Sequence, residues 1–420
     1  MSRNRVIYQS EALFVSKNIN SVQSGDHLQV RRVQSANYNF SIERQDVNQF
    51  GQLARIDALV LASPTVTLDF SYYPTDGFNE NILGFYVQTG NGIEGNFSSG
   101  QMGSSSGQNY YIVTAAEGQD LNTEVSTQYL TATGNVTGTG YHSSLSGKSV
   151  IAIGNAFLSN YTFDASVGNL PTVSVTVEGL NIKSSTYQYR SGIVTGIIPP
   201  DNIFQFGTGT SGRIEAVSSP SIDPVLGSEL GLSGTLQNPS EATGTAMISA
   251  LRPGDIVFGW DAWTGTSQTG APIVSLNQEN SINIQSASLQ LPLSRTPIER
   301  LGSRFAFARV VDFPIVASLN ISAIVNEIEA KSLASMLDDN SKRNITLSIK
   351  KPGEPDVYAM KFTMKGAQLQ SESFSSSIGA NKTVDLVFQT QIGGPSDTNN
   401  GIYLSGSYAD EGNSNGQWGY

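Results

Sequence analysis

The sequence predicts a mainly β protein that contains two tandem copies of one domain, each with about one helix, together with long loops. Two segments occur twice in the same order, and apolar residues alternate with polar ones inside them. The chain has 420 residues, of which 14% are charged and 42 are Gly. Polar but uncharged chains of this composition usually form β-structure with long loops, and this length is sufficient for two or three domains.

The first repeated segment covers residues 33–51 and recurs without gaps at 284–302, an offset of 251 residues. The identical positions are Gln34, Ser35, Ala36, Arg44 and Gly51, which recur as Gln285, Ser286, Ala287, Arg295 and Gly302. Apolar positions also correspond, for example Phe40 with Leu291 and Phe50 with Leu301. A repeat of this kind determines the architecture of the whole chain.

The second repeated segment covers residues 156–178 and recurs at 367–389, an offset of 211 residues. Val173, Val175 and Val177 alternate with polar residues, the period of a strand with one buried face. The fall in offset from 251 to 211 indicates about 40 extra residues in the first copy.

These repeats define the expected domain boundaries. The chain is divided into an N-terminal arm (1–29), copy 1 (30–180) with an insertion at about 77–150, a linker (181–252), copy 2 (253–393) and a C-terminal tail (394–420). The sequence 253–255 before two apolar residues is matched with 24–26, so that each domain begins near there. One helix is expected in copy 2, from about Ala323 to Asp339, where apolar residues could share one side.

Composition argues against several classes of protein. The net charge of −11 makes the average surface repel phosphate, which argues against a tight nucleic-acid binder. The absence of Cys excludes a thiol nucleophile, a disulfide framework and Cys-based metal sites. Neither a signal peptide nor an apolar run of membrane-spanning length is found, so no membrane association is expected.

No catalytic, cofactor-binding or metal-binding residue is predicted, and we expect no enzyme activity. Residues 90–95 fit the spacing G-x-G-x-x-G, but 96–100 do not supply the helix that a dinucleotide site needs, so this segment is interpreted as a loop. A Ser-His-Asp site with His27 or His142 stays a minor alternative. The adjacent carboxylates 338–339 fit a solvated helix end better than a divalent-ion site.

The repeated stretches also resemble a known family. The sequence QSANYNFSIERQDVNQFGQLARID, together with GNAFLSNYTFDASVGNLPTVSVTVEGLNI and its echo in copy 2, is similar to the tail tube, or major tail, proteins of long-tailed bacteriophages. This resemblance implies that each copy is a β-sandwich or barrel whose rings stack into a tube for genome passage. Members with two fused domains form trimers with six quasi-equivalent units.

The resemblance further implies a structural virion protein in the phage tail that is present in the bacterial host cytoplasm during assembly. Its partners would be other copies of itself, other tail proteins, and double-stranded DNA that passes transiently without specific binding. A capsid decoration or receptor-binding virion protein is the alternative. An enzyme such as a glycosidase ranks last, since no pair of carboxylates can be placed.

Overall fold

The computed structural model describes residues 11–17, 27–41, 43–60, 65–88, 95–102, 107–114, 149–179, 181–186, 251–262, 283–298, 301, 308–324, 342–351, 354–375, 383–394 and 397–407. These residues form a mainly β structure, which confirms that part of the expected fold class. Among the described strands, every pairing is antiparallel except one, between β7 (Val87–Gln88) and β20 (Gly401–Gly406). None of the described helices is long and apolar enough to cross a membrane.

The strands fall into two sets, here called unit 1 and unit 2. Unit 1 contains β1 (Glu11–Lys17), β3 (Val33–Ser41), β4 (Arg44–Val47), β5 (Asp57–Val60), β6 (Thr65–Tyr72), β8 (Gln108–Thr114), β9 (Ser149–Ser166), β10 (Thr172–Gly179) and β11 (Asn181–Thr186). Unit 2 contains β12 (Ile256–Ala262), β13 (Asn283–Pro292), β14 (Arg295–Ile298), β15 (Ala308–Val311), β16 (Val316–Ile324), β17 (Arg343–Lys351), β18 (Glu354–Ser375), β19 (Thr383–Gln391) and β20 (Gly401–Gly406).

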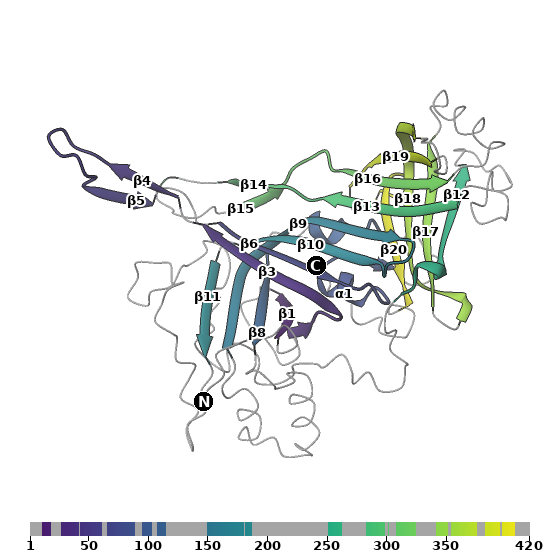
Figure 1. Ribbon diagram of the computed structural model, residues 1–420, viewed down its shortest axis with the longest axis horizontal. Helices are drawn as coiled ribbons and strands as arrows, with labels where there is room; N and C mark the ends of the chain where they lie inside the picture. Colours follow the sequence, from purple (N-terminus) through teal and green to yellow (C-terminus); the bar gives the residue numbers. More distant parts are fainter. Residues whose placement is uncertain are drawn as a thin grey trace, which may run out of the picture.

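Eight strands form one continuous sheet, here called the long sheet, in the order β3-β6-β10-β9-β13-β16-β19-β18. The first four belong to unit 1 and the last four to unit 2, and both units have the same strand order. The two units meet where β9 pairs with β13. Figure 1 shows the long sheet running from β3 across the molecule to β19 and β18.

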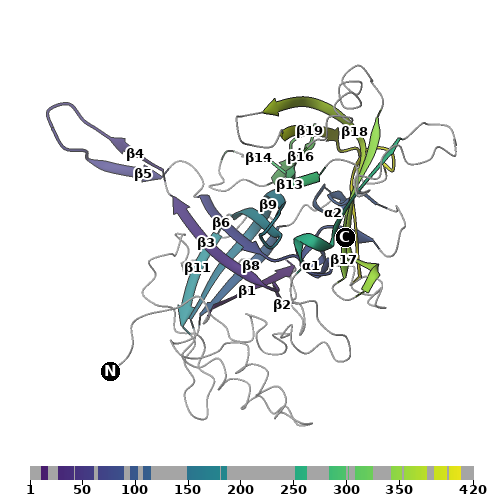
Figure 2. The same ribbon diagram turned by 45° about the vertical axis from the view of Figure 1, so that its right-hand side comes forward.

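Each unit also has a second sheet. In unit 1 its order is β1-β8-β9-β11, and in unit 2 it is β12-β17-β18-β20. The strands β9 and β18 are long enough to belong to both sheets of their unit, with 18 and 22 residues. Figure 2 shows the strands of the two second sheets as separate groups, with β8 and β11 of unit 1 on the left and β17 of unit 2 on the right.

The registers of the two units agree strand by strand, including their irregularities. The β3–β6 ladder skips Gln34, and the β13–β16 ladder skips Gln285. The β9–β10 ladder skips Ser159, and the β18–β19 ladder skips Gln370. A β-bulge fixes the local twist and register of a strand, so the corresponding strands of the two units change register at matching positions.

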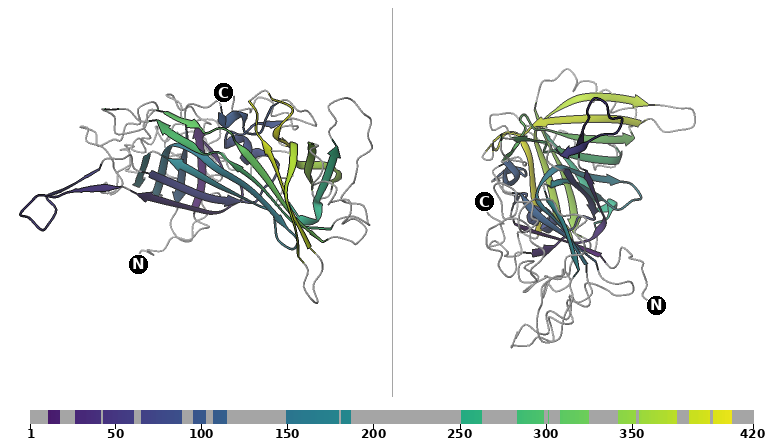
Figure 3. Two further views of the ribbon diagram at one scale, coloured as in Figure 1. Left: turned by 90° about the horizontal axis from the view of Figure 1, so that it is seen from above. Right: turned by 90° about the vertical axis from the view of Figure 1, so that its left-hand side faces the viewer.

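The short β4–β5 and β14–β15 hairpins also correspond. Arg44 pairs with Val60 in one hairpin, and Arg295 pairs with Val311 in the other. Both hairpins leave the long sheet toward the same side of the molecule, and β4–β5 projects well beyond the rest of the described chain (Figures 1 and 3).

The core lies where the long sheet packs against the second sheets. Apolar side chains from both units join into one buried cluster, because alternate residues of each strand point to the same face. The burial patterns of β6, β10, β16 and β19 all alternate in this way. The alternation of Val173, Val175 and Val177 is therefore confirmed as the pattern of a half-buried strand.

Unit 1 has an additional segment between β6 and β8, here called the inserted segment. It contains α1 (Phe78–Ile82), β7 (Val87–Gln88) and α2 (Ser99–Met102). Tyr110 of β8 corresponds in register to Ile345 of β17, an offset of 235 residues. The offset between the units is 251 up to β6, 235 at β8 and 211 at β9. Unit 1 therefore has extra residues in two places, in the β6–β8 connection and in the β8–β9 connection.

Several expected boundaries differ from the structure. Residues 11–17 of the expected arm, 181–186 of the expected linker and 401–406 of the expected tail are strands of the second sheets. In the shared register β1 has no residue identical to β12, and β11 matches β20 only at Ile182 with Ile402 and Ser185 with Ser405. Matches this short do not stand out in a search for repeats. The match of 253–255 with 24–26 was wrong, since the strand that follows the 3-10 turn Pro253–Asp255 is β12, which occupies the position of β1 and not of β2 (His27–Gln29). Residues 24–26 themselves lie outside the described part of the chain.

The expected helix at 323–339 was wrong at its start. Ala323 and Ile324 are the last residues of β16, where Ala323 pairs with Val384 of β19. Residues 325–341 lie outside the described part of the chain. The two α-helices that the structure does describe lie in the inserted segment of unit 1, and they have only 5 and 4 residues.

Candidate assembly interface

One face of the long sheet is polar and weakly acidic. Its side chains are mostly Ser, Thr, Asn and Gln, and its carboxylates include Asp69, Asp164 and Asp385. Within the eight strand segments of the long sheet (33–41, 65–72, 157–166, 172–179, 283–292, 316–324, 368–375 and 383–391) there is no Lys or Arg. A shallow hollow of about 680 Å³ opens on this face across the junction of the two units. The strands of this face therefore contribute no cationic group that could bind a phosphate.

Hydrogen bonds between side chains hold the polar face in order. Thr176 donates to Asp69 at 2.7 Å between oxygens, across the β6–β10 pair. The hydroxyls of Ser35 and Ser71 lie 2.7 Å apart across the β3–β6 pair. Such cross-strand pairs stabilise a sheet by a few tenths of a kcal/mol to about 1 kcal/mol each, and they occupy groups that could otherwise bind a ligand.

The junction of the two units is a regular antiparallel pair between β9 and β13. Leu289 lies opposite Phe163, and both side chains are buried, with 2% and 0% of their surface exposed. The ladder continues beyond the paired strands, because Leu293 N donates to Ser159 O and Val167 N donates to Gln285 O. Unit 1 and unit 2 are thus joined by backbone hydrogen bonds and by a shared apolar core.

Two arginines of the β14–β15 hairpin cross this junction. Arg295 donates to the backbone oxygen of Gln101, and its guanidinium carbon lies 4.7 Å from the centre of the Phe157 ring. Arg309 donates to the backbone oxygen and carboxylate of Glu178 at 3.3 and 3.5 Å. Burial, and then the nearby Arg309, lower the pKa of Arg295 to about 10, so its side chain stays charged at neutral pH.

The inserted segment fills the space behind the junction. Phe85 and Phe97 are stacked with their ring centres 4.2 Å apart, and both meet the edge of Tyr161. Phe97 also contacts Phe362 of β18 in unit 2, with the ring centres 6.2 Å apart. Val87 of β7 pairs with Leu404 of β20. The inserted segment of unit 1 therefore packs against both units at once.

A buried carboxyl group lies at the centre of this packing. Glu80 of α1 accepts hydrogen bonds from Tyr72 at 2.9 Å and from Tyr161 at 3.2 Å. Its side chain is buried with 1% of the residue exposed. Burial raises the pKa of Glu80 to about 7, against the lowering effect of these hydrogen bonds.

The two outer strands of the long sheet, β3 and β18, have exposed edges, in contrast to the buried β9–β13 junction. Among the described residues, β3 pairs with β6 alone, and residues 368–375 of β18 pair with β19 alone. By register, Tyr38 of β3 corresponds to the buried Leu289, and Phe374 of β18 corresponds to the buried Phe163. Tyr38 and Phe374 are 36% and 45% exposed. The positions that are buried at the junction as Leu289 and Phe163 are thus exposed at the two edges as Tyr38 and Phe374.

Large apolar residues are also exposed on the hairpins. Phe50 and Leu53 near the tip of β4–β5 are fully exposed, as is Leu301 near the tip of β14–β15. Phe50 and Leu301 are the matched positions of the sequence repeat. Exposed apolar side chains at equivalent places suggest contact surfaces.

The structure brings none of the considered catalytic residues together. His27 lies in β2, where its backbone pairs with Ser16 of β1. His142, Asp338 and Asp339 lie outside the described residues, as do residues 90–94 of the glycine-rich segment. The expectation that no helix follows this segment was wrong in part, because α2 begins at Ser99, but α2 has only four residues. No group of three or more His, Asp or Glu that could hold a metal occurs in the described ranges.

The edges and the arginine contacts were not recognised from the sequence. The identity of Arg44 with Arg295 and the match of Phe50 with Leu301 were visible in the repeat. Those matches indicate that the two hairpins have equivalent surface residues. The sequence does not indicate, however, which strands lie at the edge of the sheet.

Comparisons with known proteins gave structural neighbours only. No family model matches the chain, and no curated protein does. Among solved structures, the chain is similar to the SPP1 tail tube, with 11% identity over 38% of this chain and 84% of that one and a TM-score of 0.26. It is also similar to the tail of an empty gene transfer agent particle refined with C6 symmetry, with 11% identity over 34% and 96% of the chains and a TM-score of 0.25. A chain of the native gene transfer agent virion gives 11% identity, 37% and 98% coverage and a TM-score of 0.24.

Proposed function

We propose that this chain is a structural protein of a phage-type tail tube, and that three copies of it close into a ring of six units. The observation that carries the proposal is the equivalence of the internal junction and the free edges. Among the described residues, each chain has one β9–β13 junction, and the outer edges of β3 and of residues 368–375 of β18 pair with no further strand. Because the edges are different surfaces, their pairing is heterologous, and such contacts close into rings when the rotation permits.

The register of the proposed contact follows from the internal junction. If β18 of one chain takes the place of β9, and β3 of the next chain takes the place of β13, Tyr38 lies opposite Phe374 and Asn39 lies opposite Ser373. Both exposed apolar side chains would then be buried against each other. Backbone groups of two edge strands would be satisfied as well, which is the usual way that exposed edges drive association.

The ring would have the polar face of the long sheet toward its bore. This face carries acidic groups and, in the described strands, no Lys or Arg. DNA phosphates bind chiefly to cationic side chains, so double-stranded DNA could pass without being retained. The exposed tips at Phe50 and Leu301 would contact the adjacent ring when rings stack.

A disulfide experiment tests the ring directly, since the natural chain has no Cys. Odd-numbered residues of β13 bond to β9, as Leu293 and Gln285 do, so Gln290 and Thr162 form a non-hydrogen-bonded pair with Cα atoms about 4.5 Å apart. Such a separation suits a disulfide. The equivalent pair between chains is Asn39→Cys with Ser373→Cys.

We expect the Asn39→Cys/Ser373→Cys protein to give a covalent trimer under oxidising conditions, seen on a non-reducing gel. The Gln290→Cys/Thr162→Cys protein is the control that must form its bond within one chain. Asn37→Cys/Ser373→Cys shifts the register by two residues and should link poorly. Electron microscopy should show stacked trimeric rings with a hollow bore. A folded protein that stays monomeric at high concentration, or trimers that never stack and instead bind a capsid or a receptor, would contradict the proposal.

A further inference from the structure

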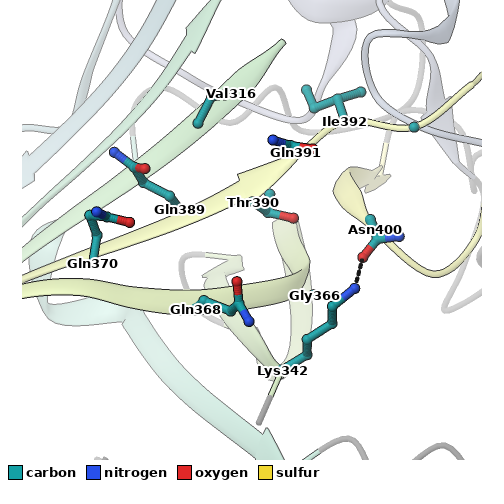
Figure 4. A pocket seen from close by; sticks show the side chains of 11 residues that line it. Val316, Lys342, Gly366, Gln368, Gln370, Gln389, Thr390, Gln391, Ile392 and Asn400 are labelled. Carbon is teal, nitrogen blue, oxygen red and sulfur yellow. Dashed lines mark hydrogen bonds between the residues drawn. The ribbon is translucent and has the colours of Figure 1, made fainter. Parts of the chain in front are cut away.

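A groove of about 450 Å³ lies on unit 2 beside the free edge of β18. Its lining includes four glutamines, Gln368 and Gln370 from β18 and Gln389 and Gln391 from β19. Figure 4 shows these side chains around the opening, with Lys342 and Asn400 at one end. Lys342 donates to Asn400 at 3.1 Å. The groove therefore presents neutral amide groups, and its own cation already has an acceptor.

The same place in unit 1 is filled. In the shared register, Gln368 corresponds to Phe157 and Gln389 corresponds to Glu178. Phe157 lies under the guanidinium of Arg295, and Glu178 accepts from Arg309. Both arginines come from the β14–β15 hairpin of unit 2. The groove is thus the position in unit 2 that corresponds to a hairpin-binding site in unit 1.

We propose that this groove receives Arg44, at the root of the β4–β5 hairpin, from a second copy of this chain. Arg44 begins β4 as Arg295 begins β14, and its pairing with Val60 repeats that of Arg295 with Val311. Arg44 is exposed in the single chain. This inference rests on the proposed ring, because β3 must pair with β18 for Arg44 to lie opposite Gln368.

The chemistry of the groove suits an arginine. A guanidinium has five N–H donors and no acceptor, and each glutamine side chain offers an amide oxygen. In the described part of the chain, Arg295 is held by a backbone oxygen and an aromatic ring. The amide oxygens of the groove can therefore accept from an arginine, as the backbone oxygen of Gln101 accepts from Arg295. Lys342 at the far end would oppose a second cation near it, which restricts the docking position to the glutamine side.

Charge reversal on each side tests the contact. We expect Arg44→Glu to raise the protein concentration for half-maximal trimer formation by roughly tenfold, since an attractive contact is replaced by a poor one. Gln368→Arg should weaken assembly similarly by placing two cations together. The double variant Arg44→Glu/Gln368→Arg should recover most of the loss. Arg55→Glu is the matched control, because Arg55 is an exposed arginine of the same hairpin that pairs with Asp46 and should change the value less than twofold.

The Asn39→Cys/Ser373→Cys link separates this inference from the proposed ring. If that link forms a trimer while Arg44→Glu and Gln368→Arg leave the assembly concentration unchanged, the groove contact is wrong and the ring stands. If neither the link nor any trimer forms, both fail. Losses in the single variants without recovery in the double variant would also overturn the contact, since they would show that the two residues do not meet. Circular dichroism of each variant must match the parent protein.

Discussion

The strand edges that meet at the internal junction, β9 and β13, correspond by register to the two outer edges of the long sheet, β18 and β3. At the junction, Phe163 and Leu289 face each other and are buried, whereas their equivalents Phe374 and Tyr38 are exposed. The difference is not in the strands, whose registers and bulges agree. It lies in what covers them: the same chain supplies the partner strand at the junction, and in the proposed ring a second chain supplies it at the edges. Residue exposure alone would have described Tyr38 and Phe374 as ordinary surface.

The largest expected effect comes from removing one backbone N–H at the free edge. Odd-numbered residues of β13, including Leu289, bond to β9, so the N–H of the equivalent Tyr38 points away from β6. Tyr38→Pro should abolish trimer formation, because proline cannot donate and is tolerated only on edge strands. Analytical ultracentrifugation should show a folded monomer.

Tyr38→Thr is the control for that experiment, since it removes the ring but keeps the N–H and a residue type suited to strands. It should still form trimers, with some loss of affinity. Trimers of normal stability in Tyr38→Pro would show that β3 is not an assembly edge.

The paired phenylalanines sharpen the comparison by separating folding from assembly. Phe163→Ala should lower the free energy of unfolding by about 3–5 kcal/mol, because it leaves a cavity at the junction. Phe374→Ala should lower it by less than about 1 kcal/mol but should weaken trimer formation. Denaturant titration of the monomer and sedimentation of the assembled protein measure the two quantities. Equal losses of monomer stability would mean that β18 is already covered within one chain.

The buried carboxyl behind the junction predicts a pH dependence of stability. Burial raises the pKa of Glu80 to about 7 from 4.5, so the unfolded chain loses this proton first as the pH rises. Stability should fall between about pH 4.5 and 7 and then level off, a loss of about 3 kcal/mol. Glu80→Gln, which can still accept from Tyr72 and Tyr161, should be more stable than the parent above pH 7.

The two proteins should have nearly equal stability well below pH 4.5, at roughly pH 3, where Glu80 is protonated in both the folded and the unfolded state of the parent. Thermal denaturation across this range measures the difference. A constant difference at all pH values would show that the benefit of Glu80→Gln does not arise from the proton, and the buried position of Glu80 would need revision.

The smallest effect on stability is expected for a substitution on the polar face of the long sheet, which extends over both units. Asp385→Lys is at an exposed site, so the free energy of unfolding should change by about 0.5 kcal/mol or less. Assembled tubes of this variant should nevertheless retain DNA at low salt and release it at high salt. Asp385→Asn should not retain DNA. If neither variant differs from the parent, this face does not line the bore.

The sequence predicted the class of fold and the strands that carry matched residues, but not the second sheets. The identical Gln34 and Gln285 are the bulge residues of β3 and β13, so the strongest match fell where backbone geometry restricts the side chain. The strands β1 and β12 have the same length and pairing but little identity. Their only shared requirement is to be apolar on one face, and many sequences satisfy that.

The candidate interface could not be predicted from the sequence, because the sequence does not show which strands are neighbours in the sheet. Strand order decides which strand is an edge, and it depends on long-range pairing that no local pattern reports. Arg44 and Arg295 match in the repeat, but one is exposed and the other crosses a junction. The same residue type therefore has two environments, and only the arrangement of the strands distinguishes them.

The strands β9 and β18 each pass without a break from the second sheet of their unit into the long sheet. The two layers of a unit consequently share one backbone and cannot slide past each other as separate plates. A tension applied along the bore of an assembled tube would be transmitted outward through covalent bonds, not only through side-chain packing. The wall of such a tube should therefore respond to bending as one stiff shell.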